Sequence, residues 1–159
     1  MNFRIGNGYD VHALAEGETL WLGGIRIEHD KGTIAHSDGD VLIHAICDAM
    51  LGALSLGDIG QHFPDTDQNY KNIDSKILLK KCRQLLSNKG YSIVNIDSTI
   101  CAQRPKLMLH LPQMIKCISE ILKIEHEQVS VKATTSEHLG FVGREEGISS
   151  YAVVLLQKN

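Results

Sequence analysis

Apolar and polar residues alternate with a period of two in several parts of the chain, which predicts β-strands. The segments with this alternation are Phe3 to Ala13, the two halves of 19–28, 91–103, 129–133 and 150–156. The segment 19–28 reads T-L-W-L-G-G-I-R-I-E, and its two adjacent glycines predict a hairpin turn.

Three other segments carry apolar residues at helical spacing, bounded by residues that commonly cap or end helices. The expected boundaries are Ser37 to about Leu54 for the first helix, Asp74 or Ser75 to Gly90 for the second, and Pro112 as the start of the third. No repeat, low-complexity tract or linker divides the sequence. Strands that alternate with helices therefore predict one domain over 1–159, an α/β (α+β) fold. We expect a two-layer sandwich with a mixed β-sheet and helices on one face.

The composition is that of an ordinary globular protein, with 43% hydrophobic and 22% charged residues and a net charge of −3. A net negative chain is a poor binder of nucleic acid or of anionic membranes, so we expect neither partner. No apolar run reaches the length of a membrane span, and no signal-peptide pattern precedes the first strand. We expect the protein in a bacterial cytoplasm, or in a plastid-type organelle after processing.

The first strand contains the pattern G-Y-D-V-H, which places an acid and an imidazole on one face of the strand. Residues i and i+2 of a strand point the same way, so Asp10 and His12 project together. If the first helix adds His44, the three side chains offer ligands for zinc with one coordination position open. Asp48 or Asp40, one helical turn from His44, could orient its imidazole. The alternative is a polar helix edge without a metal.

A second group of polar residues follows the strand at 129–133, in the segment V-K-A-T-T-S-E-H-L-G-F. The hydroxyls of Thr134, Thr135 and Ser136 stand at a strand end, where phosphate oxygens are commonly bound. Glu137 could either close a capping box or ligate a hard divalent ion such as Mg²⁺. Arg144 follows a short loop later, either at this anion site or simply exposed. The sequence has no nucleophile or nucleotide-loop motif. Phosphoryl transfer, which depends on positioning and charge neutralisation, fits such a site.

Six motifs in this order carry a resemblance to a known family: G-Y-D-V-H, A-H-S-D-G-D-V, L-G-D-I-G-Q-H-F-P-D-T-D, P-K-L, V-K-A-T-T-S-E-H-L-G-F and G-R-E-E-G-I. The chain resembles, from end to end, the 2-C-methyl-D-erythritol 2,4-cyclodiphosphate synthases of the non-mevalonate isoprenoid pathway. The resemblance implies a ferredoxin-like fold and a homotrimer with active sites between subunits. It also implies conversion of 4-diphosphocytidyl-2-C-methyl-D-erythritol 2-phosphate to the cyclic diphosphate and CMP, by intramolecular phosphoryl transfer.

The resemblance also assigns expected roles to residues. Asp10, His12 and His44 are expected to hold one Zn²⁺ per subunit and Glu137 a Mg²⁺ or Mn²⁺, while His36 and Thr135 stabilise the transition state. The residues expected around the methylerythritol part are Ser37, Asp58, Gly60, Phe63, Pro64, Asp65, Thr66 and Asp67. Those expected around the cytidine are Ala102, Gln103, Arg104, Pro105, Lys106, Leu107 and Met108. The remaining expected substrate-binding residues are Thr134, Ser136, Phe141 and Arg144.

Two positions depart from the family pattern, and two other functions remain open. Leu109 stands where proline is expected, and Glu145 where a small residue is common. Some members hold an isoprenoid diphosphate on the trimer axis, where Arg144 would contribute, and a carboxylate at Glu145 would weaken such a site. The alternatives are a zinc-dependent phosphohydrolase and a non-catalytic trimeric metal-binding protein.

Overall fold

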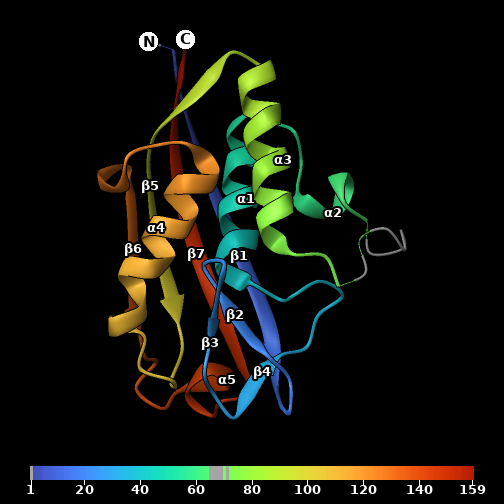
Figure 1. The fold of residues 1–159 in the computed structure, drawn as a ribbon, viewed down its shortest axis with the longest axis vertical. Helices are drawn as coiled ribbons and strands as arrows, with labels where there is room; N and C mark the ends of the chain where they lie inside the picture. The colour runs from blue at the N-terminus through green and yellow to red at the C-terminus, as the bar shows by residue number, and fades with distance from the viewer. Residues whose placement is uncertain (1, 65–69, 71) are drawn as a thin grey trace.

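The computed structural model describes residues 2–64, 70 and 72–159, and it arranges them in two layers (Figure 1). One layer is a five-stranded sheet with the strand order β4-β1-β7-β5-β6. Its strands are β1 (Phe3–Glu16), β4 (Lys31–Thr33), β5 (Tyr91–Cys101), β6 (Val129–Thr134) and β7 (Gly147–Lys158). β7 runs antiparallel to both β1 and β5, whereas β6 runs parallel to β5, so the sheet is mixed as the sequence predicted.

The second layer consists of three longer helices that cover one face of this sheet (Figure 1). They are α1 (Val41–Ala53), α3 (Ser75–Asn88) and α4 (Leu111–Leu122). The shorter elements are the hairpin β2 (Leu20–Leu22) and β3 (Ile25–Ile27), the turns η2 (Met108–His110) and η3 (His126–Gln128), and the short helices α2 (Ile59–His62) and α5 (Gly140–Gly143). The two-layer sandwich is confirmed. The sequence did not predict β4, α2 and α5, because three or four residues are too few to show a period and, unlike β2 and β3, they do not flank a two-glycine turn.

Helix α1 lies directly against the backbone of β1. A Cβ atom added at Gly6 would stand 1.8 Å from the carbonyl oxygen of Ala49, and one at Gly8 would stand 1.9 Å from that of Ala45. Only glycine allows this approach, because any side chain would collide with the helix backbone. The contact brings His44, which precedes Ala45, onto the same face of β1 as the acid and the imidazole of G-Y-D-V-H.

The start of α1 differs from the prediction. The N-cap is Asp40 and not Ser37, and the Asp40 carboxylate accepts a hydrogen bond from the backbone N–H of Ile43 at 3.0 Å. The same carboxylate accepts the N–H groups of Gly23 at 3.0 Å and Gly24 at 2.6 Å, so it joins the β2–β3 hairpin to the helix. Asp40 is fully buried, and burial raises its pKa although these hydrogen bonds oppose the shift.

The other face of the sheet carries exposed apolar side chains that no helix of the described residues covers. They include Ile5, which is 71% exposed, Tyr9 and Val11 in β1, and Tyr151 and Val153 in β7. The rings of Tyr9 and Tyr151 pack together with their centroids 4.8 Å apart. A contiguous apolar face of this kind indicates an interaction surface.

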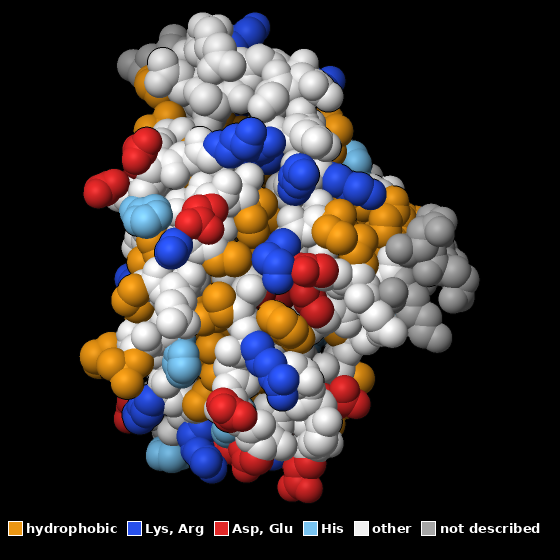
Figure 2. Space-filling model, viewed as in Figure 1, with side chains coloured by type: hydrophobic (Ala, Val, Ile, Leu, Met, Phe, Trp, Pro, Cys, Tyr) orange, Lys and Arg blue, Asp and Glu red, His pale blue; other side chains and the backbone are white. Residues whose placement is uncertain are grey.

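The helix-covered face carries basic, acidic and apolar side chains interspersed with one another (Figure 2). Within the described residues, no helix combines the length and apolarity needed to span a membrane.

Candidate metal centre

Asp10, His12 and His44 meet where α1 crosses β1, and we call these three residues the metal triad. Asp10 Oδ2 lies 2.9 Å from His44 Nδ1 and 3.1 Å from His12 Nε2, and the two ring nitrogens are 3.4 Å apart. Tetrahedral zinc with bonds of about 2.0–2.1 Å separates its ligand atoms by about 3.3 Å. The triad therefore fits one such ion and leaves one coordination position open.

The triad is electrostatically coupled. Burial by itself would raise the pKa of Asp10, but hydrogen bonds with His12 and His44 outweigh burial and hold that pKa well below its usual range. Burial would lower the pKa of His44, but the hydrogen bond and the charge of Asp10 raise it overall. Asp10 is therefore held as an anion, which is the form that a metal ion needs.

The support of the His44 ring differs from the prediction. Neither Asp48 nor Asp40 is hydrogen-bonded to the ring, because Asp48 accepts the first backbone N–H of α2 at 2.8 Å and Asp40 caps α1. Instead His44 Nε2 lies 2.8 Å from Ser75 Oγ and 3.3 Å from Ser37 Oγ. From the sequence Ser75 is predictable only as a helix cap, and no local pattern connects it with a residue 31 positions earlier.

The metal triad forms one wall of a cavity of about 200 Å³, which we call the metal pocket. His36, Ser37, Gly60 and Phe63 also line it, as the resemblance implied. His36 Nε2 is buried and has no hydrogen-bond partner among the described residues. Asp58 caps α2 beside this cavity, where its carboxylate accepts the N–H of Gln61 at 3.0 Å. Asp65, Thr66 and Asp67 lie outside the described residues, and Pro64, the residue before them, is exposed.

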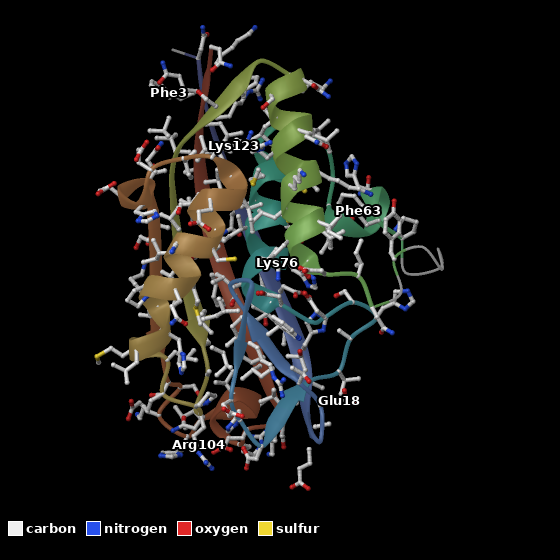
Figure 3. The ribbon with its side chains drawn as sticks, in the orientation of Figure 1. Phe3, Glu18, Phe63, Lys76, Arg104 and Lys123 are labelled. Carbon is white, nitrogen blue, oxygen red and sulfur yellow. The ribbon has the colours of Figure 1, made fainter. Side chains whose placement is uncertain are left out.

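An aromatic wall closes the side of the metal pocket that faces α3. The rings of Phe63 and Tyr70 meet edge to face with centroids 5.6 Å apart. Lys81 Nζ lies 5.4 Å from the centroid of Phe63 and 5.0 Å from that of Tyr70, which is within cation–π distance of both rings. Figure 3 shows Phe63 beside α2, next to α3. Sequence reasoning missed Lys81, because a lysine on a helix surface carries no signal of its own.

A second cavity, of about 370 Å³, lies at the ends of β5 and β6, and we call it the strand-end pocket. Its lining includes Ala102, Gln103, Pro105, Lys106, Leu107, Met108, Thr134 and Thr135. These are residues expected around the cytidine and the phosphates. Arg104 is different, because its side chain does not line the cavity and its Nη1 lies 3.9 Å from Glu145 Oε2.

The turn after the strand-end pocket holds Glu137 in an unusual conformation. Glu137 and His138 have φ values of +52° and +63°, and Thr135 Oγ1 donates to Glu137 Oε1 at 2.9 Å. The capping-box alternative for Glu137 is wrong, because the N-cap of α5 is Leu139 and makes no side-chain cap bond. Ser136 Oγ donates to the carbonyl oxygen of Leu139 at 2.6 Å, so this hydroxyl supports the turn.

The last two expected residues also lie near α5. Phe141 is half exposed, and its ring stands 3.1 Å from the position of a Cβ added at Gly147. Arg144 forms a two-bond ion pair with Glu146, with both distances 2.9 Å. Both members of this pair are exposed to solvent.

The metal pocket and the strand-end pocket are not joined within one chain. Along one rung of the sheet, Asp10 pairs with Ser150, Ser150 with Ile100, and Ile100 with Ala133. Asp10 and Ala133 are therefore three strand spacings apart, which is about 14 Å. Figure 3 shows Phe63, which lines the metal pocket, beside α2, and Arg104 near α5 at the lower end of the molecule. The structure therefore brings together two groups of the expected residues but keeps the groups apart.

The fold and the site define a class of protein, an α/β sandwich with a candidate three-ligand metal site in the wall of a cavity. A family model described as the YgbB family matches residues 3–157. The chain belongs to this family.

The curated relatives and solved structures agree with this membership. A 2-C-methyl-D-erythritol 2,4-cyclodiphosphate synthase of Bacteroides thetaiotaomicron is 60% identical over 159 residues and covers 100% of both chains. The synthase of the same name from Parabacteroides distasonis is 59% identical over 158 residues, which are 99% of this chain and 98% of the relative.

Two of the similar solved structures extend the comparison to the fold. A structure described as an IspF (Plasmodium falciparum) CDP complex has a TM-score of 0.88 and 40% identity, and the match covers 100% of this chain and 99% of that one. The bifunctional IspDF from Campylobacter jejuni has a TM-score of 0.95 and 43% identity. This match covers 99% of this chain but only 42% of the longer protein.

Proposed function

We propose that the chain converts 4-diphosphocytidyl-2-C-methyl-D-erythritol 2-phosphate to 2-C-methyl-D-erythritol 2,4-cyclodiphosphate and CMP. An oxygen of the 2-phosphate attacks the β-phosphorus, the bond from that phosphorus to the bridging oxygen breaks, and CMP leaves with the bridging oxygen. The observation that carries the proposal is the metal triad with its open position, which lies in a cavity of a chain whose full-length relatives bear this synthase name.

The reaction needs no protein nucleophile. A phosphate monoester with a second pKa near 6 is largely dianionic at pH 7 and can attack without a general base. The difficulty is to bring two anions together, and bound divalent ions neutralise phosphoryl charge and orient the reacting groups. Asp10, His12 and His44 are expected to hold a Zn²⁺. Glu137 is expected to hold a Mg²⁺ or Mn²⁺, since one carboxylate together with substrate phosphates is a common magnesium site.

The remaining roles follow from what each side chain offers. His36 is expected to donate a hydrogen bond to a phosphoryl oxygen, since its buried Nε2 has no partner among the described residues. Thr135 is expected to do the same from the strand-end pocket, which it lines. The aromatic wall of the metal pocket is expected to hold the methylerythritol part. The loop 102–108 is expected to hold the cytidine.

We further propose a homotrimer in which each active site combines the metal pocket of one subunit with the strand-end pocket of the next. Within one chain the two pockets are about 14 Å apart, so a single diphosphate cannot contact both. A closed ring of three copies would also cover the exposed apolar sheet face that includes Ile5, Tyr9 and Tyr151. Because Arg144 is already paired with Glu146, an isoprenoid diphosphate on the trimer axis would have to displace this carboxylate. We expect the trimer to work in a bacterial cytoplasm, as the relatives named above as cyclodiphosphate synthases are bacterial.

The open metal position also favours a second candidate function, a phosphohydrolase that uses zinc-activated water. A non-catalytic zinc protein is less well supported, because structural sites normally close with four protein ligands. Phosphorus-31 NMR of the purified protein with the cytidyl-diphosphate substrate and Mg²⁺ distinguishes the two reactions. We expect two coupled signals of a cyclic diphosphate together with CMP, lost after zinc is removed and restored by its return. Inorganic phosphate as the product would support the hydrolase instead.

A further inference from the structure

A network of three side chains lies behind the metal triad, on the side of His44 away from Asp10. His44 Nδ1 faces the triad, and His44 Nε2 lies 2.8 Å from Ser75 Oγ. The Ser75 hydroxyl in turn bonds to the Asp38 carboxylate at Oδ1. His44 and Ser75 are buried, at 5% and 0% exposure. We call these side chains the His44–Ser75–Asp38 network.

Backbone groups hold Asp38 in place. Its Oδ2 accepts the backbone N–H of Ser75 at 2.8 Å, and its Oδ1 accepts the N–H of Asp40 at 3.2 Å. Its own N–H donates to the carbonyl oxygen of Ile73 at 3.1 Å. Ser75 is the first residue of α3, so the same helix start fixes both its hydroxyl and its N–H. The acceptor at the end of the network is therefore rigid.

The order of donors in this network follows from the chemistry of its members. An ionised carboxylate only accepts hydrogen bonds, so Ser75 must direct its single hydroxyl hydrogen to Asp38. Ser75 Oγ is then left as an acceptor, and the ring nitrogen beside it, His44 Nε2, must carry a hydrogen. In a neutral imidazole only one nitrogen carries a hydrogen, so Nδ1 presents its lone pair to the metal triad.

We propose that Ser75 and Asp38 are positioning residues that fix the ring orientation and the tautomer of His44 for metal binding. The inference rests on the metal-binding role given to His44 in the proposed function. Neither residue touches the ion or the substrate phosphates in this proposal. Without the hydroxyl, a buried ring nitrogen would lose its 2.8 Å partner and keep only Ser37 Oγ at 3.3 Å. Outer partners of this kind typically contribute 10–100-fold to metal affinity.

Zinc affinity of the purified full-length protein tests the proposal without an activity assay. The metal is removed with a chelator, and zinc is returned in competition with a fluorescent zinc chelator. We expect Ser75→Ala to weaken zinc binding by about 10–100-fold. A titration with Co²⁺ gives a spectroscopic readout, since the visible bands of four-coordinate Co²⁺ report the ligand geometry. We expect these bands to change in Ser75→Ala.

Two further variants separate positioning from folding. Ser119→Ala is the matched control, because Ser119 is also 0% exposed but donates to the carbonyl oxygen of Lys116 in α4, and we expect it to bind zinc like the wild type. Asp38→Asn keeps the size of the side chain. Whichever oxygen its NH₂ group replaces, that group faces a backbone N–H, of Ser75 at Oδ2 or of Asp40 at Oδ1, so we expect the same 10–100-fold loss of zinc affinity. Asp38→Asn carries the comparison if Ser75→Ala does not fold.

The outcomes distinguish this inference from the proposed function. If the wild type binds zinc tightly and both network variants keep the affinity and the Co²⁺ spectrum of Ser119→Ala, the positioning role is overturned and the metal site stands. If the wild type itself binds no zinc, the metal site and the positioning role fall together. Nitrogen-15 NMR of the zinc-loaded protein gives an independent check. We expect His44 to be protonated at Nε2, and protonation at Nδ1 would overturn the proposal.

Discussion

Substituting Gly8 by alanine tests whether the close contact of α1 with β1 makes the metal triad. The added Cβ would stand 1.9 Å from the carbonyl oxygen of Ala45 and 2.8 Å from the backbone nitrogen of Ala49. Both atoms belong to the backbone of α1, so no side-chain rotation relieves the clash. The helix itself must move away from the strand.

The size of this movement follows from ordinary contact distances. A carbon and an oxygen approach to about 3.3 Å, so the helix must retreat by about 1.4 Å. His44 moves with α1, whereas Asp10 and His12 remain on β1. The gap between Asp10 Oδ2 and His44 Nδ1, now 2.9 Å, would open toward about 4.3 Å, beyond the spacing of about 3.3 Å that one tetrahedral ion requires. Overpacking of this kind also costs about 1–3 kcal/mol of stability.

The assays are zinc competition and thermal unfolding of the same preparations. We expect Gly8→Ala to lose at least about 100-fold in zinc affinity, because a ligand is displaced and not merely loosened. The matched control is Gly52→Ala in the same helix, where the nearest atom to an added Cβ is the Asn7 carbonyl oxygen at 3.9 Å. Gly52 is exposed, so alanine there is expected to stabilise the helix by about 0.5–1 kcal/mol and leave zinc affinity unchanged. A folded Gly8→Ala protein with wild-type zinc affinity would refute this reasoning.

Three other predictions concern the aromatic wall, the start of α1 and the pH dependence of stability. Lys81→Met removes a cation–π contact of about 0.5–1 kcal/mol, so steady-state kinetics are expected to show a KM about 2–5-fold higher with kcat unchanged. The control is Lys80→Met, at an exposed position on the same helix, and an equal rise in KM in this variant would contradict the prediction. Asp40→Ala leaves three backbone N–H groups without an acceptor, so urea unfolding is expected to show a free energy of unfolding lower by about 3 kcal/mol or more. A decrease under about 1 kcal/mol would be evidence that Asp40 does not join the β2–β3 hairpin to α1. In the metal-free protein the pKa of His44 is raised and that of Asp10 is lowered. Both contributions to stability are complete between about pH 4 and 6.5. The free energy of unfolding should fall above that range as folded His44 loses its proton, and below it as Asp10 gains one. His44→Gln should remove the decrease in the free energy of unfolding at alkaline pH. If the decrease is unchanged in this variant, another group causes it.

Much of the fold could be predicted from the sequence because the long elements have clear periods. The exceptions have local causes. The pattern Ser37 to Asp40 resembles a capping box, but Gly39 takes a φ of +70° and the chain turns there, so Asp40 becomes the cap. In β5 the simple alternation fails because a bulge lies between Ile93 and Asn95. Neither feature leaves a period in the sequence.

The residues of the metal triad could be predicted from the sequence, whereas the side chains around them could not. Asp10 and His12 are two residues apart in a strand, and the family motifs added His44. The contacts of Ser75 with His44 and Asp38, and of Lys81 with Phe63, join elements that are distant in sequence. No short motif encodes such contacts, because they depend on where α3 packs against α1. The sequence could therefore indicate the candidate ligands but not the distant side chains that contact them or line the pocket.

The central claim is that the metal pocket of one subunit and the strand-end pocket of another form one active site. Two differently tagged variants, His44→Ala and Glu137→Ala, are produced together, and oligomers that contain both are purified through both tags. Each variant alone is expected to be inactive. In a mixed ring of three, one of the three interfaces combines an intact triad with an intact Glu137, so we expect about one third of wild-type CMP release per trimer. Mixed oligomers as inactive as the separate variants would contradict the account, because both halves of the site would then have to come from the same chain.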